Sequence, residues 1–114
     1  MSKIVALAIR QLEAYNASDL GAFCDCYHSE VIVFDAEERI VEGLDDFRER
    51  YRGLFEGFQF GAEVSQRLDA GDHCVDYETW WRIDPETGAR SEGLVLVRYT
   101  LRDEKIGWVQ FFRE

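Results

Sequence analysis

The sequence is poor in the residues that cross-link a small protein or bind a metal ion. Its 114 residues contain three cysteines, two histidines and one proline. An odd number of cysteines does not make a complete disulfide framework. Cys24 and Cys26 lie two positions apart on a predicted helix, so their thiols point to different faces and make a poor metal pair. We expect free, largely buried thiols and no metal site. No organic cofactor is expected either, because the sequence has no glycine-rich phosphate loop.

Basic residues are also scarce. Thirteen lysines and arginines stand against 23 aspartates and glutamates, which gives a formal net charge of -10. Such a surface repels phosphate backbones and anionic lipids, so the composition argues against nucleic acid and membranes as partners. No segment is apolar over the length of a bilayer, and the N-terminus lacks a signal-peptide pattern. We therefore expect a cytoplasmic protein.

The chain has many hydrophobic and aromatic residues for its length. Hydrophobic residues make up 46% of it, charged residues 32% and aromatic residues 14%. These proportions and the length predict one globular domain over residues 1–114. Large aromatic rings fill cores, but they also line ligand cavities.

Hydrophobic spacing predicts helices first and long strands afterwards. Apolar residues recur at helical intervals over residues 4–16, after Asp19 (a suitable N-cap) and over residues 44–56. A β-branched run predicts a strand at residues 31–35, with a short partner at 40–41. From Phe58 the period is two, and turn residues divide the rest into strands at 58–68, 73–83, 91–101 and 106–112. Helices segregated against an antiparallel meander make an α+β fold.

The alternation of residues 73–83 divides them into two faces. We expect Tyr77 and Trp81 to point inward. Glu78 would then point away from the interior and pair across strands with Arg98 or Arg82.

The strand at 91–101 is apolar on both faces. Val97 belongs to one face, and Leu94 and Leu96 belong to the other, where Trp80 is also expected. One face can pack on the helices, which leaves the other as an exposed apolar patch. A second copy of the chain is the simplest cover, so we expect a homodimer through the sheet.

Asp35 ends the apolar run Val31–Phe34 and precedes a polar turn. A strand that ends on a carboxylate can hold it at the edge of a hydrophobic interior. That environment disfavours the charged form and makes the group a useful proton acceptor. The alternative is a solvated turn residue, since aspartate is common where strands stop.

Several strings in this layout resemble the nuclear transport factor 2-like (NTF2-like, SnoaL-like) superfamily, also called the cystatin-like or ketosteroid-isomerase-like fold. They are Ala14–Leu20, Val31–Asp35, Val41–Gly43 and Lys105–Ile106. The resemblance implies a cone, in which a curved, mainly antiparallel sheet wraps around three N-terminal helices and a pocket opens at one end. The superfamily hosts isomerases, cyclases, dehydratases, hydrolases and binding modules, so it fixes the fold more than the function.

The steroid isomerases of this superfamily use an aspartate base with an oxyanion hole of tyrosine and protonated aspartate. By similarity, Asp35 falls at the position of the base, and Tyr27 and Tyr51 resemble supporting tyrosines. Gln11 stands where the oxyanion-hole tyrosine is expected, and Val97 stands where the protonated aspartate is expected. Each lost donor costs roughly 10²–10³ in rate, which argues against a true steroid isomerase.

Two functions remain open. The first is a pocket enzyme of isomerase or lyase type, in which Asp35 is the general base and Gln11, Tyr15 and Tyr51 position a substrate oxygen. Its reaction would be proton abstraction beside a carbonyl, or water activation. A small apolar or aromatic ligand would contact Tyr15, Tyr27, Phe47, Phe55, Tyr77, Trp81 and Val97. The second is a non-catalytic homodimeric binding or interaction module whose cavity is filled by its own side chains. A ligand cavity of roughly 300 Å³ or more would favour the first.

Overall fold

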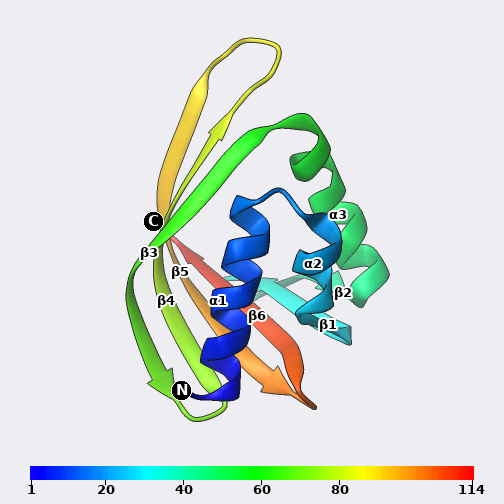
Figure 1. The fold of residues 1–114 in the computed structure, drawn as a ribbon, viewed down its shortest axis with the longest axis vertical. Helices are drawn as coiled ribbons and strands as arrows, with labels where there is room; N and C mark the ends of the chain where they lie inside the picture. The colour runs from blue at the N-terminus through cyan, green and yellow to red at the C-terminus, as the bar shows by residue number, and fades with distance from the viewer.

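A computed structural model describes all residues, 1–114, and has three helices and six strands. The helices are α1 (Lys3–Asn16), α2 (Leu20–Asp25) and α3 (Leu44–Gly57), and the strands are β1 (Tyr27–Asp35), β2 (Glu38–Glu42), β3 (Gln59–Ala70), β4 (His73–Ile83), β5 (Arg90–Arg102) and β6 (Lys105–Arg113). All six strands form one sheet in the order β2-β1-β6-β5-β4-β3, curved around the helices (Figure 1). The predicted α+β cone is confirmed.

Local capping explains where the helices begin. The Ser2 hydroxyl accepts a hydrogen bond from the Val5 amide at 3.2 Å, and the Asp19 carboxylate accepts one from the Ala22 amide at 3.1 Å. Both side chains satisfy amides that the first helical turn leaves without partners. Gly43 precedes α3 with φ at 90°, a conformation that a residue with a Cβ rarely adopts. None of the three helices is both long enough and apolar enough to cross a lipid bilayer.

The sheet is mainly antiparallel, as predicted, with one parallel pair, β1 and β6. A register shift between Val64 and Gln66 bulges β3 at Ser65. A bulge reverses the face on which the following residues point. Leu68 consequently faces outward and is 69% exposed, although its spacing from Val64 predicts the same face for both.

The hydrophobic core lies between the helices and the concave face of the sheet. α1 runs along this face, and the β4–β5 hairpin extends beyond the end of α3 (Figure 1). Phe23 of α2 stacks on Phe47 of α3 with their ring centroids 5.6 Å apart, and both are almost fully buried. Val97 of β5 is completely buried in the same cluster. Any cavity in this core therefore lies between the helices and the inner faces of β4, β5 and β6.

Candidate functional site

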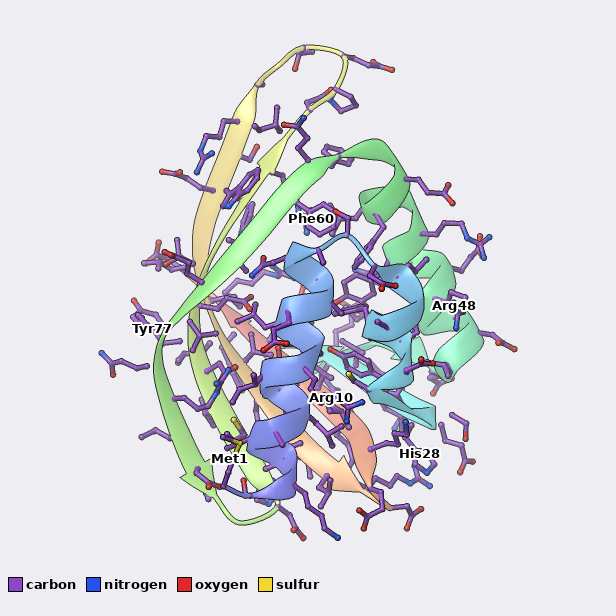
Figure 2. All side chains as sticks on the ribbon, in the orientation of Figure 1. Met1, Arg10, His28, Arg48, Phe60 and Tyr77 are labelled. Carbon is purple, nitrogen blue, oxygen red and sulfur yellow. The ribbon has the colours of Figure 1, made fainter.

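The face of strand β4 that was expected to point outward faces the interior of the protein. Cys74 and Asp76 are fully buried, and Glu78 and Trp80 line an internal cavity. Tyr77 instead lies on the outer face of the sheet, beside Leu68 and Leu96 (Figure 2). The predicted inward position of Tyr77 is therefore wrong.

Trp81 also faces outward, contrary to the prediction. Its indole covers Gly61 on β3, where a Cβ atom would lie 2.8 Å from the ring. Each face of β4 carries a tryptophan and a mixture of polar and apolar residues, so alternation defines two faces without showing which is buried.

An ion pair makes the polar inner face of β4 tolerable. The Arg67 guanidinium donates to both oxygens of Asp76, from Nε at 2.6 Å and from Nη2 at 2.8 Å. The bulge at Ser65 places Arg67 directly opposite Asp76 in the register. The Cys74 thiol donates to Asp76 at 3.4 Å, and burial together with the Asp76 charge raises the pKa of that thiol to about 12. This cluster is paired within the protein and stabilises the β3–β4 pairing.

The cavity lies between α1, α2, α3 and the concave face of β4, β5 and β6. Its volume is about 60 Å³. Such a space holds a few water molecules or a small chemical group, and it is well below the roughly 300 Å³ typical of sites for larger ligands. Its apolar walls are Leu12, Phe23, Trp80, Val95 and Phe111, and its tyrosines are Tyr15, Tyr27, Tyr51 and Tyr99.

Gln11 is buried among these tyrosines, and its amide is fully used within the protein. Nε2 donates to the Ala8 carbonyl and to the Tyr99 hydroxyl, each at 3.1 Å, and Oε1 accepts from the Tyr27 hydroxyl at 3.0 Å. The Ala8 carbonyl fixes the orientation of the amide, because a second oxygen could not face it. Gln11 therefore has no N–H left for a substrate.

Three tyrosine hydroxyls of the cavity, those of Tyr15, Tyr51 and Tyr99, have an uncommitted proton. The Tyr99 oxygen accepts from Gln11, so its own O–H is free to donate, and the Tyr51 hydroxyl has no hydrogen-bond partner in the protein. Burial raises the pKa of Tyr51 and Tyr99 well above the ordinary value. Both phenols consequently stay neutral and can serve as hydrogen-bond donors in the cavity.

Glu78 is the carboxyl group of the cavity. It has no hydrogen bond, and no lysine, arginine or histidine nitrogen lies within 4.0 Å of it. Burial, reinforced by the neighbouring charge of Asp76, raises its pKa to about 7, while the charges of Arg113 and Arg67 act in the opposite direction. Sequence reasoning missed Glu78 because the face of β4 was inverted.

Two arginines lie at the mouth of the cavity. The Arg82 guanidinium stacks over Trp80, and the Arg113 guanidinium stacks over Phe111, each 5.2 Å from the ring centroid. Arg82 is exposed, and the Arg113 side chain is 46% exposed. The opening is thus flanked by positive charge in a strongly acidic protein.

Asp35 lies at the rim and does not line the cavity. Its side chain is 41% exposed, and Oδ1 is 3.5 Å from Nε of Arg113. The desolvated environment expected for this carboxylate is therefore absent. The only link between Asp35 and the mouth of the cavity is its contact with Arg113.

The other predicted residues divide into two groups. Gln11, Tyr15, Tyr27 and Tyr51 all line the cavity. Phe47, Phe55 and Val97 are part of, or packed against, the hydrophobic core and do not line it. The site therefore shares its tyrosines and Gln11 with the predicted one and differs in its carboxylate.

Comparisons with known proteins agree with this architecture. A family model described as the SnoaL-like domain matches residues 8–108. An uncharacterized cystatin fold protein from Novosphingobium aromaticivorans superimposes with a TM-score of 0.88 at 21% identity, covering 99% of both chains. A Δ5-3-ketosteroid isomerase from Mycobacterium sp. gives 0.89 at 10% identity, covering 100% of this chain and 95% of the other.

A third similar structure is an LEH-like epoxide hydrolase from M. tuberculosis. Its TM-score is 0.86 at 13% identity, and the match covers 98% of this chain and 83% of the hydrolase. At such identities these likenesses show the fold alone. None of the curated proteins matches the sequence.

Proposed function

The chain belongs to the SnoaL-like domain family of the NTF2-like superfamily, and from that premise we propose that its cavity binds a small organic molecule at which Glu78 acts as a general base without a cofactor. The observation that carries this proposal is an unpaired, largely buried carboxyl group that lines the cavity and has a pKa of about 7. A general base works best when its pKa is close to the operating pH.

Two hydroxyl groups complement this base. Tyr51 and Tyr99 each have an O–H that no protein group uses. They can donate to a carbonyl oxygen while Glu78 removes a proton from the adjacent carbon, and they stabilise the negative charge that develops on that oxygen. The same groups can instead orient a water molecule from which Glu78 takes a proton. The cavity is large enough for water.

Steroid isomerisation is not the proposed reaction. Gln11, which occupies the expected oxyanion-hole position, has both amide hydrogens committed to Ala8 and Tyr99. The cavity volume of about 60 Å³ also favours a much smaller substrate. The comparison structures include an isomerase and an epoxide hydrolase, so a small ketone and a small epoxide are suitable first probes.

Asp35 keeps a different role in this proposal. Its contact with Arg113 holds that guanidinium at the mouth of the cavity. Asp35 is the general base predicted from the sequence, so it is the alternative to Glu78 that an experiment has to test.

The experiment compares two isosteric substitutions. Deuterium exchange beside the carbonyl of 2-butanone in D₂O, and hydrolysis of propylene oxide, are followed by NMR for wild type, Glu78→Gln and Asp35→Asn. We expect wild type to accelerate one of these reactions, Glu78→Gln to abolish the acceleration and Asp35→Asn to retain most of it. Loss in Asp35→Asn with full activity in Glu78→Gln would make Asp35 the base and refute this assignment.

A second candidate function is a homodimeric interaction module, and the outer face of the sheet favours it. Leu68, Leu96 and Phe112 are 69%, 42% and 45% exposed and lie near Tyr77. Such a patch is typical of an interaction surface. The cavity volume of about 60 Å³ also favours this function, because it falls below the roughly 300 Å³ expected of a ligand site. The two functions do not exclude each other, because the patch and the cavity lie on opposite faces of the sheet.

A further inference from the structure

Two tryptophan–arginine stacks lie on opposite faces of the β4–β5 hairpin. On the inner face, Arg82 stacks over Trp80 at 5.2 Å from the ring centroid. On the outer face, Arg90 stacks over Trp81 at 5.0 Å. The hairpin itself extends past the end of α3 (Figure 1). Only the inner stack lies at the mouth of the cavity.

Glycines let both indoles lie flat on the sheet. A Cβ atom at Gly93 would be 2.8 Å from the Trp80 ring, and one at Gly61 would be 2.8 Å from the Trp81 ring. The two stacks are thus built in the same way. In each stack the indole rests directly on the backbone, so the guanidinium that lies over it is held at a defined height above the sheet.

The stacks differ in charge compensation. The Arg90 Nε atom is 3.2 Å from a carboxylate oxygen of Glu92, so the outer guanidinium is neutralised. Arg82 has no carboxylate within 4.0 Å, although the chain carries 23 acidic residues and a net charge of -10. A guanidinium that is stacked, positioned and left without a counterion offers its donors to a ligand.

A second guanidinium flanks the same opening from β6. Arg113 stacks over Phe111, and Asp35 approaches its Nε atom at 3.5 Å. An arginine presents five N–H donors, so most of those of Arg113 remain available. Arg82 and Arg113 both line the cavity, so Arg113 adds to the positive charge around an opening at which Arg82 can donate to a carboxylate.

We propose that the ligand of this cavity is a small organic acid, whose carboxylate is bound at the mouth by Arg82 while its uncharged end points inward. This inference rests on the proposed function only for the location of the ligand. The inward end would point into the cavity that Glu78, Tyr51 and Tyr99 line. The cavity volume of about 60 Å³ limits that end to a short chain. Trp80 and Phe111 supply apolar walls for it.

The test uses butyrate and its neutral isostere butyramide as probes. Each is titrated into the full-length protein, and the indole N–H signal of Trp80 is followed by ¹H–¹⁵N NMR. We expect butyrate to shift this signal and to bind roughly tenfold more tightly than butyramide, the gain typical of a charge-assisted hydrogen bond. Arg82→Gln should reduce butyrate affinity to that of butyramide, and Arg82→Lys should restore part of it.

Arg90→Gln is the matched control. It removes the same charge from the same kind of stack on the other face, so butyrate affinity should not change. Equal affinities for butyrate and butyramide, equal losses in Arg82→Gln and Arg90→Gln, or no binding of either probe would each overturn the inference. The proposed function fails differently, through unchanged catalysis in Glu78→Gln, so the two failures are distinguishable.

Discussion

Replacing Glu78 with glutamine is predicted to stabilise the protein in a pH-dependent way. The pKa of Glu78 is about 7 in the folded protein, against 4.5 for the ordinary group, mainly because burial disfavours the charged form. Between these values the folded protein keeps a proton on Glu78 that the unfolded chain has released. The free energy of unfolding of wild type therefore falls as pH rises through this interval.

The size of the effect follows from the two pKa values. Their difference corresponds to about 3 kcal/mol, at about 1.4 kcal/mol for each pKa unit. Glutamine resembles the protonated carboxyl group and does not ionise. Below pH 4.5 the variant should match wild type closely, and above pH 7 it should be more stable by up to about 3 kcal/mol.

Urea unfolding at a series of pH values measures this difference directly. The relevant quantity is the free energy of unfolding of the variant minus that of wild type, because other titrating groups contribute equally to both. Glu63→Gln is the control, since it makes the same change at an exposed position of the neighbouring strand β3. A stability difference for Glu78→Gln that does not change with pH would refute the burial of this carboxyl group, and with it the basis for its catalytic role.

Three other substitutions test the remaining features. Leu96→Glu, on the exposed face of the sheet, should convert the proposed homodimer to monomer in sedimentation velocity; an unchanged sedimentation coefficient would count against that dimer. Asp76→Asn leaves the Arg67 charge without its buried partner and should cost about 3–5 kcal/mol in urea unfolding, so a loss within experimental error would contradict the importance of this pair. Gly93→Ala puts a methyl group 2.8 Å from the Trp80 ring and should lower the free energy of unfolding by about 1–3 kcal/mol. It should also change the NMR shift of the Trp80 indole N–H. An unchanged spectrum would mean that the ring does not rest on this glycine.

Local signals were sufficient for the order of the elements. The Asp19 cap, the β-branched run at Val31–Phe34 and the turn at residues 70–72 each act within a few residues, so one sequence is enough to read them. The resemblance added the way in which these elements assemble into a cone. Helical spacing predicted inner positions for Tyr15, Tyr27 and Tyr51, although Tyr27 belongs to β1, and the resemblance alone pointed to Gln11.

The sequence by itself thus determined the helices, the strands and the aromatic content of the interior, because propensity, capping and periodicity are properties of neighbouring residues. Only the tertiary structure decided which face of β4 is buried. That choice depends on Arg67, which a bulge in β3 brings opposite Asp76, and on the helices that cover Glu78. It also left Asp35 at the rim beside Arg113. Residues distant in the chain decide that Glu78, and not Asp35, is desolvated. The sequence pattern around either acid does not contain this information.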